Sequence, residues 1–582
     1  MDSKIYNITE DFLKMIPRKD SACKNLNYLI VMPKQAELQF QYIFPTGMGI
    51  VTSALKAGGR NVSTLNLTYK KNPHDELKAA ILKNNIDVVM TGGLSGQFAL
   101  LKDIIDTAKS INPYIITAVG GGIITAEPDI AMRALENADY GMVGEGEITI
   151  NELAYTLETE GDPRNVPGVI VKGRSEFIPR AEIMNLDCIP FPDYDGFNYA
   201  ESFLQGYSRT TIKKETGAVI ITSRSCPYNC TFCFHSSGKR YRRRSLDKVF
   251  LELDMLKERF PLDYVQIADE LFGNDIEYVR EFARRIKPYG IKYLINTRLD
   301  RISDELLGIL SDSGCEEILF GIEHVCDTVL ESMQKKTKAS IIEPTLRKCL
   351  KYGIRPIGNI IFGDVAETED TMEEALEWWR YNHHLGSITT TYLIVFPGSS
   401  IYKKARERGI INDPVQFLKD GCPLVNMTSM DDSQWQTMKN RVAFYRILYE
   451  DKPDIDIRQI KKSLGEIAEK YDSCVWPATN DSIRFFREMS DRFYKRTTFI
   501  NIDTDSQMLR DIDCRKQVFS PEIIEEKSIQ VVVCPRRAFV EDIRKICFEK
   551  YPSVWCVVDI GDLSTGIWRG YIPLEKREDS IV

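Results

Sequence analysis

The chain of 582 residues carries 76 Lys and Arg against 84 Asp and Glu, a formal net charge of −8. This mildly acidic balance lacks the overall signature of a nucleic-acid binder, and 43% hydrophobic with 27% charged residues excludes a disordered or fibrous chain. The sequence has no run of about 18 apolar residues and no secretory signal at its start, so we expect a cytoplasmic protein without a membrane or nucleic-acid partner.

The amino-terminal region alternates short apolar runs with segments of helical spacing. After a lead segment of residues 1–26, a domain is expected over 27–163. Its apolar runs lie at 28–32, 62–67, 88–91, 115–119 and 140–143. Strands alternating with helices predict βαβ units and a doubly wound, Rossmann-like parallel sheet. The ligand of such a sheet is expected at the carboxyl ends of its strands.

Residues 164–215 are rich in proline and aromatic residues and are interpreted as a connecting segment, with a small hairpin of 168–171 and 176–178 around Gly173. From 216 to 420 six apolar strands recur between helical segments, which fits a partial barrel or an open sheet. These strands are expected near 218–222, 264–268, 291–295, 317–321, 357–361 and 389–395. The last region, 421–582, reads as helical at first and ends in a strand at 529–534, a helix at 537–549 and a strand at 554–560. It predicts a carboxyl-terminal α/β domain that we interpret as a cap over the substrate site, with the binding of a nucleotide or a carrier as the alternative.

Three cysteines follow the first strand of the second alternating region. The segment ITSRSCPYNCTFCFHSSGKRYRRRS places Cys226, Cys230 and Cys233 in one polar loop. Thiolates at this spacing can hold a soft metal or an iron–sulfur cluster, and three ligands leave one iron of a 4Fe-4S cluster open. Two alternatives stand beside this interpretation, a Cys₃His zinc site that adds His235, and three inert cysteines.

The CxxxCxxC spacing with Phe232 before its last cysteine resembles the radical S-adenosylmethionine (SAM) enzymes. Further motifs follow in that family's order: VQIADELFG, NTRLDRI, EILFGIEH, GNIIFGDVAETEDT and the Pro397–Gly398 turn. The resemblance implies a partial (β/α)₆ TIM-type barrel whose 4Fe-4S cluster is bound by the three cysteines. It also implies SAM contacts from Phe232, Asp269, Glu270, Arg298 and Glu323.

Glycine-rich loops punctuate the amino-terminal domain at FPTGMG (44–49), TGGLSG (91–96), VGGGIITAEP (119–128) and VGEGE (143–147). Taken singly, each can be no more than a tight turn between a strand and a helix, and none fits the dinucleotide-binding fingerprint. The set resembles the cobalamin-binding domain that precedes the radical core in one radical SAM subfamily. This implies cobalamin contacts from Gly47, Thr91, Gly92, Leu94, Ser95, Gly96, Gly120, Gly121, Gly122, Glu145, Gly146 and Glu147. The chain departs from the Asp-x-His-x-x-Gly segment of the cobalamin mutases, and its only histidine in this domain is His74, so no histidine ligand to cobalt is expected.

The combined resemblance implies a cobalamin-dependent radical SAM enzyme that reductively cleaves SAM to a 5′-deoxyadenosyl radical. Its implied reaction is class B-type methylation of an unactivated carbon or phosphorus of a small molecule, with a flavodoxin- or ferredoxin-type electron donor. A non-methylating rearrangement, cyclisation or oxidation is the alternative reaction, and a cobalamin- or redox-sensing binding protein is the alternative of another class. The basic run GKRYRRRS at 238–245 could contact phosphate or an electron donor, but we interpret it as a solvated loop.

Overall fold

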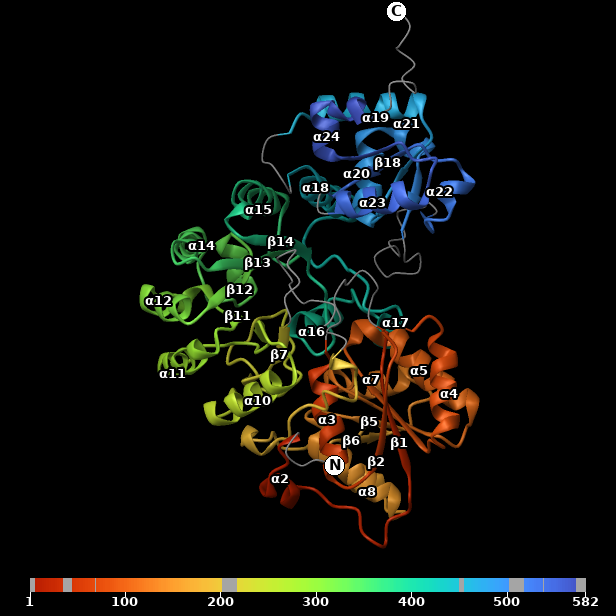
Figure 1. The fold of residues 1–582 in the computed structure, drawn as a ribbon, viewed down its shortest axis with the longest axis vertical. Helices are drawn as coiled ribbons and strands as arrows, with labels where there is room; N and C mark the ends of the chain where they lie inside the picture. Colours follow the sequence, from red (N-terminus) through yellow and green to blue (C-terminus); the bar gives the residue numbers. More distant parts are fainter. Residues whose placement is uncertain are drawn as a thin grey trace, which may run out of the picture. The chain divides into compact units, whose positions relative to one another are not determined.

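A computed structural model gives the fold of the chain (Figure 1). It describes residues 6–34, 44–68, 70–200, 217–449, 455–501, 518–536 and 539–571. Residue contacts divide the chain into a first unit of 1–366 and 385–427 and a second unit of 367–384 and 428–582. The domain boundaries expected from the sequence are finer than this division and stay predictions. No helix of the described residues is both long enough and apolar enough to cross a membrane.

The first unit begins with a six-stranded sheet of order β2-β1-β3-β4-β5-β6. Its first five strands are parallel, and β6 runs antiparallel on β5. The strands are β1 (Asn27–Met32), β2 (Asn61–Asn66), β3 (Val88–Gly92), β4 (Ile116–Gly120), β5 (Tyr140–Met142) and β6 (Val169–Val171). The strand order reverses between β1 and β3, which is where a doubly wound sheet binds its ligand. The predicted fold class of this domain is confirmed. The expected hairpin is wrong, because β6 pairs with β5 and residues 176–178 form no strand, although the amide of Gly168 donates to the carbonyl of Ile178 at 2.7 Å.

The apolar runs become strands because the helices bury them on both faces. In β1 every residue after Asn27 is buried, and in β3 the first four residues are buried. The helices between the strands are α3 (Thr46–Ala57), α4 (Pro73–Lys83), α5 (Phe98–Ile111), α6 (Gly122–Ala126), α7 (Pro128–Ala134) and α8 (Gly146–Glu158). In α5 the buried residues Leu101, Ile104, Ile105 and Ala108 recur at helical spacing and form one apolar face. The glycine-rich loops therefore connect strand ends to helix starts at one edge of the sheet.

The second sheet of this unit has the consecutive order β14-β13-β12-β11-β10-β7, with all strands parallel. Its members are β7 (Gly217–Ile220), β10 (Tyr264–Ile267), β11 (Lys292–Thr297), β12 (Cys315–Glu323), β13 (Arg355–Phe362) and β14 (Ser387–Tyr392). All six lie where the sequence predicts them. Connecting helices include α10 (Leu246–Arg259), α11 (Ile276–Ile286), α12 (Asp304–Asp312) and α14 (Ile342–Lys351). Consecutive parallel strands joined by helices form the predicted partial barrel.

One hydrophobic core joins the two halves of the first unit. It combines Phe98, Leu101 and Ile124 of the amino-terminal domain with Leu393, Val395, Ile401 and Phe417, which follow the last barrel strand. Helix α16 (Ser400–Glu407) belongs to this core through Ile401, Tyr402 and Ala405, and helix α17 (Pro414–Lys419) belongs to it through Phe417 and Leu418. Burial of this apolar surface fixes the barrel against the glycine-loop domain.

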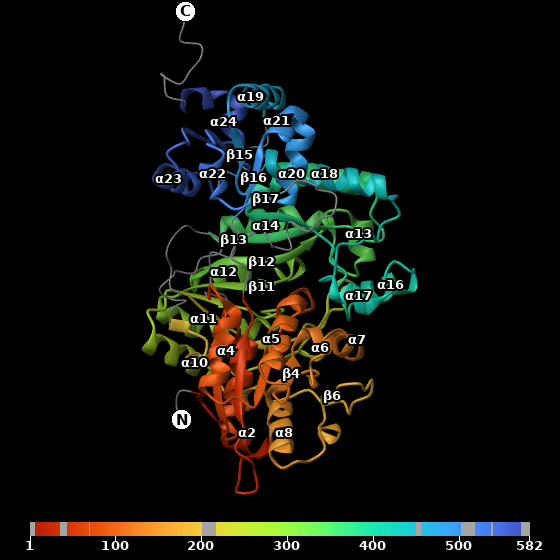
Figure 2. The ribbon, with the colours of Figure 1, turned by 90° about the vertical axis from the view of Figure 1, so that its right-hand side faces the viewer.

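The second unit holds a five-stranded parallel sheet of order β17-β16-β15-β18-β19. Its strands are β15 (Ser473–Val475), β16 (Thr498–Ile500), β17 (Val518–Phe519), β18 (Val531–Cys534) and β19 (Cys556–Asp559). Helices α19 (Ile457–Lys470) and α24 (Ile560–Thr565) lie on one side of the sheet and α23 (Val540–Lys550) on the other (Figure 2). The predicted α/β class is confirmed, although the sequence indicated only β18, α23 and β19.

Candidate active site

The three cysteines lie in a loop closed at its base by a two-stranded ribbon. Strand β8 (Ser223–Arg224) pairs antiparallel with β9 (Arg242–Arg243), and the loop between them follows the first barrel strand. Cys226 is half-buried, Cys230 is buried and Cys233 is exposed. The amide of Cys233 donates to the carbonyl of Cys230 at 3.1 Å, and the amide of Thr231 donates to the carbonyl of Met333 at 3.0 Å. The loop is thus braced by the chain after β12.

The surroundings of the thiols keep them protonated until a metal centre binds. Burial raises the pKa of Cys226, and the charges of Glu270 and Cys230 raise it further. Burial also raises the pKa of Cys230, whereas the nearby ammonium of Lys335 lowers it. Such thiols stay protonated on their own at neutral pH. A metal centre must therefore displace their protons, and the cations nearby would stabilise the resulting anionic site.

The arrangement fits an iron–sulfur cluster better than zinc. Within the described ranges, no three His, Cys, Asp or Glu side chains are arranged to surround one metal ion. His235, the fourth ligand of the zinc alternative, instead contacts Glu270 Oε2 at 3.0 Å through Nδ1 and the carbonyl of Tyr228 at 3.1 Å through Nε2. In a 4Fe-4S cluster each thiolate binds a different iron, so the sulfur atoms need not converge on one point. The residues present therefore fit the cluster.

Asp269 and Glu270 follow the second barrel strand but have different environments. Asp269 is 1% exposed, and its carboxylate accepts from the amides of Thr222 and Ser223 at 2.6 and 3.0 Å and from both of their hydroxyls. Burial raises the pKa of Asp269, and these hydrogen bonds partly offset the effect. The four bonds occupy its acceptor positions, so Asp269 holds the end of β7 in place. Glu270 lines the large cavity described below.

Phe232 is part of the cysteine loop, Arg298 contacts the loop at Tyr228, and Glu323 pairs with Lys335 next to it. Arg298 Nε donates to Asp300 Oδ1 at 2.8 Å and its Nη2 donates to the carbonyl of Lys335 at 2.7 Å, while its guanidinium stacks 3.8 Å from the centroid of the Tyr228 ring. Its Nη1 makes no hydrogen bond within the described part of the chain, which leaves it for a ligand carboxylate. The buried Glu323 accepts from Lys335 Nζ at 2.7 Å. Phe232 packs on Cys326, Val329 and Met333.

A cavity of about 440 Å³ lies between the glycine-loop domain and the barrel. All twelve residues implied for cobalamin line it except Ser95 and Gly96. A Cβ added at Gly47 or Gly144 would meet no atom within 4 Å, so glycine at these lining positions keeps the cavity wide. Its place at the strand-order reversal and its open glycine loops fit a large flat cofactor such as a corrin. His74 pairs instead with Asp103 at 2.7 Å and is not among the lining residues.

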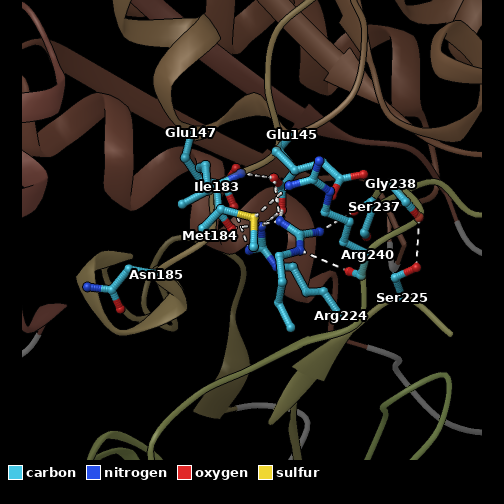
Figure 3. A network of polar contacts seen from close by, with 12 residues as sticks. Glu145, Glu147, Ile183, Met184, Asn185, Arg224, Ser225, Ser237, Gly238 and Arg240 are labelled. Carbon is cyan, nitrogen blue, oxygen red and sulfur yellow. Dashed lines mark hydrogen bonds and ion pairs between the residues drawn. The ribbon is translucent and has the colours of Figure 1, made fainter. Parts of the chain in front are cut away.

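Two of the residues that line the cavity, Glu145 and Glu147, have carboxylates that form ion pairs with arginines (Figure 3). Arg224 donates to Glu145 Oε1 at 2.6 Å and to Glu147 Oε1 at 2.5 Å, and Arg242 donates to Glu145 Oε2 at 2.8 Å. The sequence did not indicate Arg224, whose partners lie far away in the chain. For Arg242 the interpretation as solvated loop is wrong, because its side chain is 2% exposed. An ion pair between residues far apart in the chain cannot be predicted from the local sequence of either residue.

Family models match the glycine-loop domain and most of the barrel region. Residues 220–378 match the radical SAM superfamily, and residues 40–154 match the B12 binding domain.

Curated relatives and a solved structure agree with these matches. An uncharacterized methyltransferase of Pyrococcus horikoshii is 27% identical over 51% of this chain and 64% of its own length. The cytidylyl-2-hydroxyethylphosphonate methyltransferase of Streptomyces wedmorensis is 24% identical over 68% of this chain and 87% of its own. The cobalamin-dependent SAM radical enzyme OxsB, solved with aqua-cobalamin and SAM bound, is 16% identical with a TM-score of 0.59, over 81% of this chain and 71% of its own. At this identity the structural likeness establishes the fold.

Proposed function

We propose that this chain, which belongs to the B12-binding radical SAM family, is a cobalamin-dependent radical SAM methyltransferase that acts on a small molecule. One observation carries the proposal. The glycine loops of the B12-binding domain share a single cavity with Ser223, Ala268 and Glu270, which stand at the carboxyl ends of the first two barrel strands. A corrin on the loops and a ligand at the barrel mouth would therefore lie against each other.

The site has residues suited to bind both the cluster and SAM. Cys226, Cys230 and Cys233 would bind the cluster. Glu270, held by His235, would accept hydrogen bonds from the amino group of SAM, and the uncommitted Nη1 of Arg298 would bind the SAM carboxylate. When bound, the cluster supplies the electron that cleaves SAM, and cobalamin carries the methyl group. The protein positions these parts and keeps water away from them.

The family and the relatives support the proposed substrate class. The two curated relatives described above are named methyltransferases, and one of them is named for a phosphonate. We propose methylation of an unactivated carbon or phosphorus. A flavodoxin- or ferredoxin-type donor would supply the electron. The cytoplasm suits the free state of the described cysteines, because its thiols are kept reduced.

The test is anaerobic purification and reconstitution, followed by iron, sulfide and cobalt analysis and incubation with SAM and a strong reductant. We expect both cofactors, 5′-deoxyadenosine and S-adenosylhomocysteine. Formation of 5′-deoxyadenosine without S-adenosylhomocysteine would favour a non-methylating reaction. A protein that binds both cofactors but never cleaves SAM would be a sensor, and a colourless zinc protein would refute the proposal.

Replacing one cluster cysteine tests the site directly. We expect Cys230→Ala to lose most of its iron and all 5′-deoxyadenosine formation, because two thiolates cannot retain the cluster. Cys23→Ala is the matched control, since Cys23 lies in the lead segment away from the loop, and it should keep the iron and the activity. Undiminished SAM cleavage by Cys230→Ala would contradict the assignment.

A further inference from the structure

The loop that carries the three cysteines leaves and rejoins the barrel at two arginines that face each other. Arg224 on β8 pairs in register with Arg242 on β9, so the two residues close the base of the loop from either side. Arg224 lies two residues before Cys226. Their side chains are 11% and 2% exposed, and both reach the same loop of the B12-binding domain, the loop between β5 and α8. A shift of the loop between β5 and α8 would therefore displace both ends of the cysteine loop.

Glu145 is the point at which the two arms meet. Its Oε1 accepts from Arg224 Nη1 at 2.6 Å and from Arg242 Nη1 at 2.9 Å, and its Oε2 accepts from Arg242 Nη1 at 2.8 Å and from the amide of Ile183 at 2.7 Å. The side chain is 6% exposed. These hydrogen bonds occupy the acceptor positions of the Glu145 carboxylate and leave none for a cofactor. Its role in the structure is to fix the cysteine loop to the cavity loop.

Glu147 differs from Glu145 in that one of its oxygens is uncommitted. Oε1 accepts from Arg224 Nη2 at 2.5 Å, while Oε2 is buried without a hydrogen-bond partner among the described residues. Glu147 is 3% exposed and lines the cavity. A buried carboxylate oxygen without a partner is costly, and the cost is removed when a ligand in the cavity donates to it. Amide groups, such as those at the edge of a corrin, are suitable donors.

We propose that Glu145, Glu147, Arg224 and Arg242 form an ionic clamp that couples occupancy of the corrin cavity to the geometry of the cluster loop, with Arg224 and Arg242 as positioning residues. This inference rests on the proposed function. A ligand N–H bound at Glu147 Oε2 orients that carboxylate, the carboxylate orients Arg224, and Arg224 sets the start of the cysteine loop. The chain of contacts is continuous and buried throughout, which is the condition for transmitting a local change rather than absorbing it.

Linkage makes the proposal measurable. If the cluster alters the affinity for cobalamin by some factor, cobalamin must alter the affinity for the cluster by the same factor. The experiment determines the dissociation constant of hydroxocobalamin for the full chain with and without its reconstituted cluster, from the visible spectrum under anaerobic conditions. We expect tighter binding with the cluster present by about fivefold or more, which is the usual scale of coupling between two sites.

The variants decide whether the clamp carries this coupling. Arg224→Met removes the guanidinium that joins Glu145 to Glu147. The affinities for hydroxocobalamin with and without the cluster should then differ by less than about twofold, even where both cofactors still bind. Arg224→Lys keeps the positive charge and should restore part of the coupling. Arg243→Met is the matched control, because Arg243 stands beside Arg242 on β9 but pairs with the exposed Asp275 at 2.7 Å, and it should keep the full coupling.

Each outcome has a definite meaning. Equal affinity with and without the cluster in the wild type overturns the clamp, and so does full coupling in Arg224→Met. If Arg224→Met does not fold, the isosteric Glu147→Gln replaces it, and retention of full coupling there also overturns the proposal. A wild-type chain that takes up no cobalamin or no cluster refutes the proposed function instead, so the two failures are distinguishable.

Discussion

At the scale of single residues, adjacent members of one motif have separate roles. Asp269 and Glu270 are neighbours in the sequence, yet the first is saturated by Thr222 and Ser223 and the second faces the cavity. Both follow the end of β10, where the chain turns, so one side chain is directed into the protein and the other toward the cavity. The pair is recognisable from sequence, but which carboxylate meets a ligand depends on what packs over it.

We expect Asp269→Asn to destabilise the protein without changing the exposed face of the site. The amide would turn an NH₂ group toward the hydroxyl or amide donors of Thr222 and Ser223, which lowers the free energy of unfolding by about 2–3 kcal/mol. Urea denaturation of the cluster-free protein measures it. Glu270→Gln is the control, with an expected loss of about 0–1 kcal/mol for its partly exposed pair with His235. Equal losses in both variants would contradict the structural role of Asp269.

Lys248 on α10 predicts a pH dependence of stability. The side chain lies against the Phe191 ring at 4.7 Å and is 6% exposed, and burial lowers its pKa from 10.5 to about 8. At a pH between about 8 and 10.5, Lys248 is protonated in the unfolded chain but has lost its proton in the folded chain. The free energy of unfolding therefore gains a contribution that rises with pH across this window.

The variant Lys248→Met lacks this contribution. We expect the wild type to gain stability relative to the variant as the pH rises from about 8 to 10, because other titrating groups cancel in the difference. Urea denaturation of both proteins over this range measures it. A difference that stays constant with pH would show that the lysine is not buried as described.

At the scale of elements, the glycine loops are where local sequence and local structure agree most closely. Gly121 has φ +85°, and a Cβ there would lie 2.8 Å from the carbonyl oxygen of Gly93, so two neighbouring loops approach each other through backbone alone. This contact links the ends of β3 and β4 beside the cavity. A βα turn of this kind accepts only glycine without strain.

We expect Gly121→Ala to separate these two loops. The left-handed backbone and the close carbonyl cost about 1–2 kcal/mol, which corresponds to about a tenfold loss of cobalamin affinity if the loops must close for binding. Equilibrium titration followed by the visible spectrum measures it. Gly308→Ala in α12 is the control, because a Cβ there has only Tyr352 Cε1 nearby, at 3.9 Å. Unchanged affinity in Gly121→Ala would argue against a corrin on these loops.

Strand length and regular alternation with helices together explain which elements the sequence revealed, since the three-residue β5 was indicated only by its place in a series of βα units. The runs of β1, β12 and β13 are long and flanked by helical spacing, so their periodicity is unambiguous. The strands β15, β16 and β17 consist of Ser473–Val475, Thr498–Ile500 and Val518–Phe519, too short to show a period. Neighbouring strands stabilise them in the sheet, and this information is absent from the local sequence.

At the scale of the whole molecule, the two units do not follow the order of the chain. Helix α15 (Glu369–Asn382) comes between the barrel strands β13 and β14 but belongs to the second unit, where Tyr445 of α18 (Asp432–Tyr449) donates to Glu373 at 3.1 Å and Arg441 pairs with the same carboxylate. The chain thus passes from the first unit to the second and returns. A boundary read from composition shifts cannot register such an exchange, because it depends on packing between distant segments.

The sequence by itself determined the two alternating βα regions, the cysteine loop and the glycine loops, because strand periodicity and turn chemistry act over a few residues. Only the tertiary structure decided that Glu145 and Glu147 pair with Arg224 and Arg242, that Asp269 is a buried support, and that the cavity opens on Glu270. Charges and cavities depend on which segments packing brings together. Partners separated by some 80 to 100 residues leave no trace in the pattern of either segment.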